Sequence, residues 1–74
     1  MFPLTFASPG ELLEIVGFSM EDSSFFPRLL SMGLISGKVV EVLSSCGSIL
    51  IKIDHAKLAI GRDVAMKIIV RSLR

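Results

Sequence analysis

The stretch RLLSMGLISGKVVEVL, residues 28–43, decides the fold of this chain. It predicts a short helix that ends at Gly33, a turn built on Gly37 and then a strand rich in β-branched residues. Glycine after a helix supplies the left-handed residue of a Schellman stop, in which Leu34 folds back onto Leu29. Glycine at the third place of the next four residues is what a type II turn requires. We expect the rest of the chain to pack around this helix, turn and strand.

The helix is expected to begin near Ser24, which can cap it, with Pro27 in the first turn. A missing N–H in the first turn costs no hydrogen bond, because that group has no partner within the helix. Spacing along the helix predicts one side that faces the core. The residues of this predicted stripe are Phe26, Leu29, Leu30 and Gly33.

Alternating hydrophobicity predicts five short strands, at 11–18, 39–43, 48–53, 57–60 and 67–71. Their expected inward residues are Leu13, Ile15, Val40, Val42, Ile49, Ile51, Ile53, Leu58, Ile60, Ile68 and Val70. Gly17 predicts a bulge or a close backbone approach, and Leu4 and Ala7 are spaced to touch one surface. The predicted fold is mainly β with short helices. It is a small barrel of about five strands, with one helix between strands one and two and a helical turn, near 63–66, before the last strand.

The apolar content exceeds what a small domain can hide. Hydrophobic residues are 51% of the 74 residues, and six more are glycine, against a usual apolar share of about 45–50%. A chain of this length buries only about 60% of its unfolded surface. We therefore expect an apolar patch that serves a partner or self-association.

The charges and termini indicate a single cytosolic domain over residues 1–74. Eight Lys and Arg residues nearly balance seven Asp and Glu residues, for a net charge of +1, so nucleic acid is not the expected partner. A single cysteine excludes an internal disulfide. No basic region precedes an apolar run at the amino end, and no stretch reaches the ~18 residues that span a bilayer. Direct membrane insertion is therefore not expected.

Few side chains could carry chemistry. His55 and Cys46 are the single histidine and cysteine, and opposite ends of one predicted strand separate them by about 20 Å, too far to share a metal ion. Asp54 beside His55 is typical of a turn. Glu21 and Asp22 could hold a hard cation but more commonly polarise a helix start. No phosphate loop, CxxC, HExxH or GxSxG motif occurs, so we predict no enzyme, no cofactor and no metal site.

A docking face is predicted on the outer side of the helix. Adjacent helical positions point about 100° apart, so the two neighbouring phenylalanines at 25 and 26 cannot both face the core. One of them should project beside Met32, and aromatic side chains are frequent anchors of protein interfaces. The candidate partner-binding residues are Phe25, Phe26, Arg28, Leu29 and Met32.

The run from Arg28 to Leu34, followed by Gly37, resembles the central sequence motif of the FeoA family. Members of this family are small cytosolic proteins of bacterial ferrous iron uptake. The segments that extend the likeness on either side are 9–11, 15–18, 40–42, 58–60, Ala65, Ile68 and Val70. The likeness spans residues 4–70, nearly the whole chain. It departs from the family at Ser36, where proline is usual, at Gly61, which is often basic, and in the shorter loop 44–48.

The resemblance implies an SH3-like barrel, in agreement with the strand count. It also implies a non-enzymatic accessory protein of ferrous iron transport that acts by protein–protein interaction. The implied partner is the FeoB-type membrane transporter, with its cytosolic G-protein domain or membrane part as the point of contact. The chain would then be cytoplasmic and peripheral to the inner membrane through its partner, with homo-oligomers as a further option. Arg28 or Arg62 are candidates for an arginine finger toward the G-protein domain.

Three alternatives stay open at this stage. The first is an SH3-like module related to the C-terminal domain of iron-dependent transcriptional repressors, although the chain contains no helix-turn-helix. A small RNA-binding barrel is the second, and the near-neutral charge disfavours it. Binding of a transition metal ion by this chain alone is the third.

Overall fold

The computed structural model describes residues 1–19 and 26–73, except the side chains of Phe26 and Arg28. The elements, in chain order, are β1 (Phe2–Pro3), the 3-10 helix η1 (Leu4–Phe6), β2 (Leu12–Phe18), α1 (Phe26–Ser31), β3 (Val39–Ser44), β4 (Ile49–Ile53), β5 (Ala56–Ile60), α2 (Arg62–Ala65) and β6 (Ile68–Ser72). The predicted helical turn near 63–66 is thus confirmed as α2.

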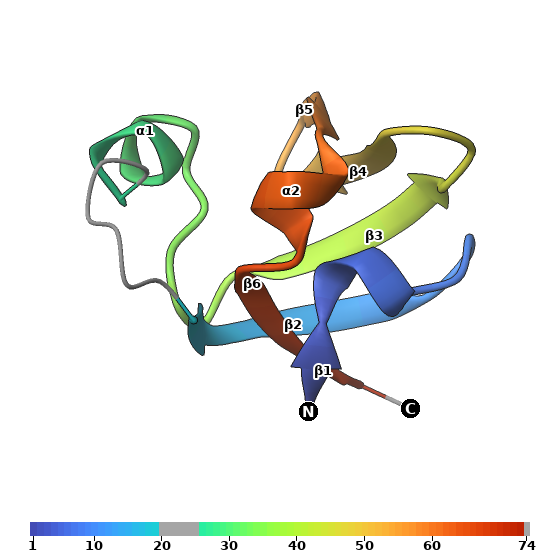
Figure 1. Ribbon diagram of the computed structural model, residues 1–74, viewed down its shortest axis with the longest axis horizontal. Coiled ribbons are helices and arrows are strands. Elements are labelled where there is room, and N and C mark those ends of the chain that lie inside the picture. The colour runs from blue at the N-terminus through green and yellow to red at the C-terminus, as the bar shows by residue number, and fades with distance from the viewer. Residues whose placement is uncertain (20–25, 74) are drawn as a thin grey trace.

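The six strands form one antiparallel sheet in the order β1-β6-β2-β3-β4-β5. The sheet bends around the core without closing, which is an open form of the SH3-like barrel that the sequence predicted. Its two edges are β1 and β5, and Figure 1 shows them at opposite sides of the molecule. α1 lies to one side of the sheet, on the side where β2 ends, and coil separates it from the strands (Figure 1).

The core is formed by the inward residues of the strands, as their alternation predicted. Those with 3% exposure or less are Leu13, Ile15, Val40, Val42, Ile49, Ile51, Ile53, Ile60, Ile68 and Val70. Leu58 is half-buried and packs against them. Leu4 of η1 and Ala7 are also buried, so the predicted shared surface of these two residues is confirmed.

The end of α1 is a Schellman stop, as the sequence predicted. Gly33 has φ 82°, a conformation that costs glycine little because it has no Cβ. The Leu34 N–H donates to the Leu29 carbonyl at 2.9 Å, and the Gly33 N–H donates to the Leu30 carbonyl at 3.0 Å. Leu29 and Leu34 are both buried, so the fold-back adds a hydrophobic contact to the two hydrogen bonds.

The predicted turn at Gly37 is also present, and it is tied to β2. Gly37 has φ 93°, and the Lys38 N–H donates to the Ile35 carbonyl at 3.2 Å. Across the turn, the Gly37 N–H donates to the Ile15 carbonyl at 2.8 Å, and the Ile15 N–H donates to the Lys38 carbonyl at 2.9 Å. The turn therefore fixes where β3 starts relative to β2.

Gly17 marks a bulge, as expected. The register between β2 and β6 shifts between Ile15 and Gly17, which leaves Val16 without an opposing residue. A second register shift, between Val42 and Ser44 in the β3–β4 pair, gives no signal in the sequence.

The number of strands and the position of Leu30 differ from the sequence prediction. The sheet has a sixth strand, because the two residues of β1 pair with β6, and a run that short shows no alternation. Leu30 was predicted in the core stripe and this is wrong, since 47% of it is exposed. Successive residues on a helix are about 100° apart, and Leu29 is the one that points inward.

Candidate functional site

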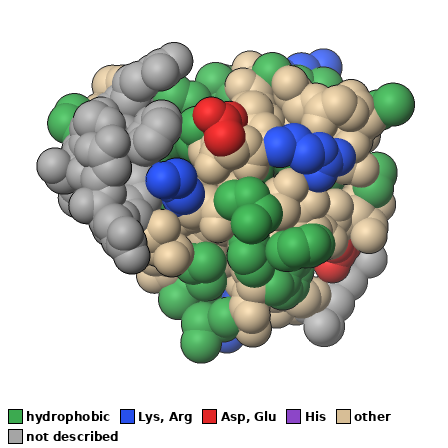
Figure 2. All heavy atoms as spheres, in the orientation of Figure 1, with side chains coloured by type: hydrophobic (Ala, Val, Ile, Leu, Met, Phe, Trp, Pro, Cys, Tyr) green, Lys and Arg blue, Asp and Glu red, His purple; other side chains and the backbone are tan. Residues whose placement is uncertain are grey.

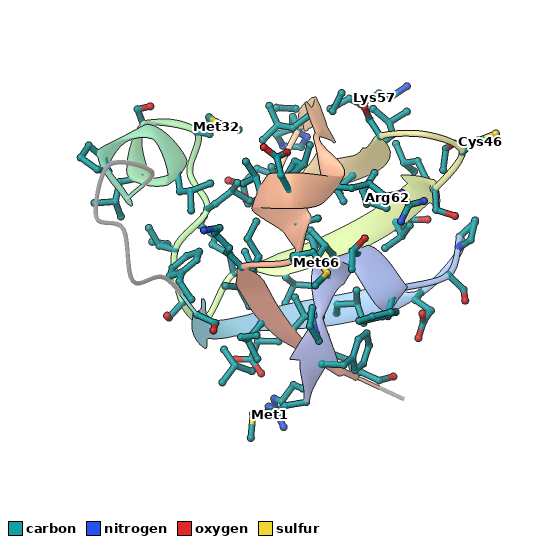
Figure 3. The ribbon with its side chains drawn as sticks, viewed as in Figure 1. Met1, Met32, Cys46, Lys57, Arg62 and Met66 are labelled. Atoms are coloured by element: carbon teal, nitrogen blue, oxygen red, sulfur yellow. The ribbon has the colours of Figure 1, made fainter. Side chains whose placement is uncertain are left out.

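Of the predicted partner-binding residues, the structure describes the side chains of Leu29 and Met32. Leu29 is 2% exposed and belongs to the core, so it can act on a partner only by supporting the residues above it. Met32 is half-buried against the core, and Figure 3 shows it at the carboxyl end of α1. Phe25 lies outside the described residues, as do the side chains of Phe26 and Arg28. These three stay predictions.

Leu30 is the surface residue of α1 that sequence reasoning missed. The two hydrogen bonds of the Schellman stop fix the last turn of the helix, and Leu29 occupies the inward direction. Leu30 is therefore held outward, with 47% of its surface exposed. The sequence signal for this position is the 100° step between neighbouring helical residues, which turns Leu30 outward once Leu29 points inward.

Apolar side chains also surround the glycine turn between α1 and β3. Ile35, Val16 and Val39 are 40%, 38% and 49% exposed. The Ser36 Oγ donates to the Val16 carbonyl at 3.2 Å and Val39 pairs with Glu14 in β2, so all three residues lie where the turn meets β2 and β3. We call Val16, Ile35 and Val39 the turn patch.

A second apolar surface lies on η1 and just after α2. Phe6 and Met66 are 68% and 50% exposed, and Figure 2 shows hydrophobic side chains gathered over this region, in the middle of the visible face. Figure 3 places Met66 between α2 and η1 in the same view. The expected excess of apolar surface is thus present on this molecule, distributed over more than one site.

Arg62 holds these elements together. Its Nη1 donates to the carbonyl and to the Oγ1 of Thr5, at 3.0 and 2.9 Å, and its Nη2 donates to the Ser45 carbonyl. The guanidinium therefore joins α2 to η1 and to the loop between β3 and β4. Because the guanidinium already makes three hydrogen bonds within the molecule, this geometry disfavours Arg62 as an arginine finger.

The charged groups form surface ion pairs. Lys38 Nζ lies 3.1 Å from Asp54 Oδ2, and Arg71 Nη2 lies 2.5 Å from Glu14 Oε1. Within residues 1–19 and 26–73, no three His, Cys, Asp or Glu side chains gather as metal ligands would. In the same ranges, none of the helices has the length and apolar character to cross a membrane.

A known protein family matches this sequence over nearly its whole length. The FeoA domain family matches residues 2–72. The chain belongs to the FeoA domain family. A relative from Methanocaldococcus jannaschii, named "Putative Fe(2+) transport protein A", is 36% identical over 72 residues, which cover 95% of this chain and 85% of the relative.

Solved structures of FeoA proteins share the fold. A crystal structure of an iron uptake regulatory protein, FeoA, is 33% identical and superposes with a TM-score of 0.88, over 97% of this chain and 96% of that one. FeoA of Stenotrophomonas maltophilia, described as an SH3 domain protein, has a TM-score of 0.82 at 13% identity, over 96% and 91% of the two chains. The SH3-like fold is thereby confirmed.

The fold also recurs in a manganese-dependent transcriptional repressor, which is 26% identical and superposes with a TM-score of 0.89, over 96% of this chain and 41% of that one. IdeR of T. acidophilum is 26% identical to this FeoA domain and superposes with a TM-score of 0.88. The match covers 95% of this chain but only 33% of IdeR. The FeoA domain family is thus associated with Fe²⁺ transport, and the same fold forms part of these two longer chains.

Proposed function

We propose that this FeoA domain is a non-enzymatic accessory protein of ferrous iron uptake that binds a FeoB-type membrane transporter. Membership of the family and the Fe²⁺ transport relative support the transport role. The exposed apolar side chains support action through protein contacts. In this proposal the protein is cytoplasmic and reaches the inner membrane through its partner.

The observation that carries the proposal is the outward position of Leu30. α1 is short, and its last turn is fixed by the Schellman stop, so Leu30 is presented on a rigid element with little freedom to lose on binding. Ile35 of the turn patch follows shortly after in the chain and is also exposed. We extend the predicted docking face accordingly to Phe25, Phe26, Arg28, Met32 and Leu30, with Leu29 supporting it from the core.

Substitution of Leu30 tests the docking face. Leu30→Gln should lower the amount of transporter that co-purifies with this protein from membranes by about ten-fold or more, since buried apolar anchors commonly contribute ~2 kcal/mol at interfaces. Ferrous iron uptake by cells should fall with it. Met66→Gln is the matched control, because Met66 has a similar exposed fraction but lies next to α2. A folded Leu30→Gln protein that binds and supports uptake as well as Met66→Gln would refute this face.

The likeness to a manganese-dependent transcriptional repressor favours a second candidate, a module that regulates transcription together with a metal-dependent repressor. Deletion of this chain would then change transcription of iron-regulated genes and leave the activity of the transporter unaltered at equal transporter levels. Measuring uptake per copy of transporter separates the two functions.

A further inference from the structure

β5 is an open edge of the sheet. The sheet order places it last, next to β4 only, and Figure 1 shows it at the outer side of the molecule. The other edge, β1, has two residues and ends at Pro3, which has no N–H to donate. β5 is therefore the edge that another strand can join.

The hairpin geometry shows which groups of β5 point outward. β4 and β5 are joined by the two-residue turn Asp54–His55, and Ile53 pairs with Ala56 across it. Asp54 has φ 56°, a positive value as in the primed turns of two-residue hairpins. The pair that flanks such a turn exchanges hydrogen bonds, and bonded and non-bonded pairs alternate along an antiparallel ladder. The N–H and C=O groups of Lys57 and Ala59 therefore point away from β4.

These outward groups are available to a partner. Lys57 and Ala59 are exposed, and their backbone groups form no hydrogen bond with any described part of the chain outside the β4–β5 ladder. Figure 3 shows the Lys57 side chain pointing away from the body of the molecule. Beside them, Leu58 is half-buried on the inner face, where an apolar side chain of an added strand could cover it.

The charges beside this edge select the kind of strand. Lys57 lies directly opposite Lys52 on the same face of the sheet, and like charges opposite each other are destabilising. Within the described residues neither lysine has a carboxylate within ion-pair distance. A strand with Glu or Asp opposite Lys57 would relieve this repulsion.

The same charges disfavour a second copy of this chain as the occupant. In an antiparallel pair of two β5 strands centred at Leu58, Lys57 of each copy lies diagonal to Lys57 of the other. Together with Lys52 of each copy, four positive charges would gather across one seam, with no acidic residue among Ala56–Ile60 to offset them.

We propose that β5 is a docking edge for an extended segment of a protein partner that carries acidic side chains at alternate positions. The main-chain groups of Lys57 and Ala59 would hold the segment, and the Lys52–Lys57 pair would select its charge. This is strand addition, in which backbone bonds provide affinity and alternate side chains provide specificity. The proposal does not depend on the transporter, because it rests on the hairpin and its charges.

Blocked seven-residue peptides test the proposal without knowledge of the natural partner. One probe alternates valine with glutamate and the other alternates valine with lysine. NMR titration of the ¹⁵N-labelled protein should show amide shifts concentrated on residues 56–60 with the glutamate peptide. That peptide should bind about five-fold or more tightly than the lysine peptide, the ratio expected of a favourable cross-strand charge pair set against a repulsive one. Lys57→Glu should reverse the preference.

Two further variants separate strand addition from simple charge attraction. Ala59→Pro removes an outward N–H without breaking the β4–β5 ladder, and proline is tolerated at such edge positions, so the variant should fold but lose peptide binding. Ala59→Val keeps the N–H and should bind as the natural protein does. Equal binding of both peptides, shifts centred on α1, unchanged binding by Ala59→Pro, or no shift at millimolar peptide would each overturn the proposal. A dimer that Ala59→Pro dissolves would do the same.

Discussion

At the scale of single residues, a glycine with a fixed conformation organises the helix and its surface. Gly33 adopts φ 82°, and a Cβ built there meets nothing within 4 Å. The requirement for glycine is therefore conformational and not steric. Because the Schellman bonds depend on it, the inward position of Leu29 and the outward position of Leu30 depend on it too.

Gly33→Ala should lower the free energy of unfolding by about 1–2 kcal/mol, the cost of an L-residue in the left-handed region. Gly17→Ala is the matched control, since a Cβ at Gly17 also meets nothing within 4 Å but its φ is not positive. Urea unfolding should show a clearly lower midpoint for Gly33→Ala and a shift within about 0.5 kcal/mol for Gly17→Ala. Equal midpoints for the two variants would mean that the positive φ of Gly33 is not the reason why glycine is needed at the end of the helix.

At the scale of elements, Arg62 is the link that joins three of them. Its bonds to Thr5 and Ser45 span 57 and 17 residues of sequence. Arg62→Ala should cost about 1–2 kcal/mol, since hydrogen bonds from charged donors are worth more than surface ion pairs. Arg62→Lys should cost nearly as much, because a single ammonium cannot span both acceptors as a planar fork does.

The matched control is Arg71→Ala, which breaks an exposed ion pair with Glu14 and should cost less than about 1 kcal/mol. Hydrogen exchange should also quicken at Ala7, whose N–H donates to Leu4 within η1, in the Arg62 variants alone. If Arg62→Lys were as stable as the natural protein, the positive charge, and not the planar guanidinium with its two donor nitrogens, would account for the stabilisation by Arg62.

The elements themselves were largely predictable, and the surface contacts were not. Apolar and polar residues that alternate with a period of two predicted five strands and their inward sides correctly, because the burial of one strand face leaves a local pattern in the sequence. The glycines fixed the helix stop and the turn for the same local reason. By contrast, β1, η1 and the bonds of Arg62 depend on residues far apart in the chain. For the predicted docking face, the helical step could have identified Leu30, whereas the charge selection at β5 needed the strand register that only the structure supplies.

At the scale of the whole molecule, the open sheet relies on the amino-terminal segment to complete its core. β1 pairs with β6, and η1 places Leu4 among the buried residues of the strands at 1% exposure. Phe6, two residues on, is 68% exposed. One short segment thus contributes both to the core and to the apolar surface.

Shortening the side chains of Leu4 and Phe6 to alanine should therefore have very different effects on stability. Leu4→Ala should cost about 2–4 kcal/mol, since it removes buried methyl groups and leaves a cavity. That is a large part of the ~4–11 kcal/mol expected for a domain of this length, so the melting temperature should fall by more than 10 °C. Phe6→Ala removes a larger but exposed side chain and should leave unfolding within about 0.5 kcal/mol. Calorimetric melting of both variants decides the point: a stable Leu4→Ala protein would show that the strands alone complete the core, and the segment would then serve the surface only.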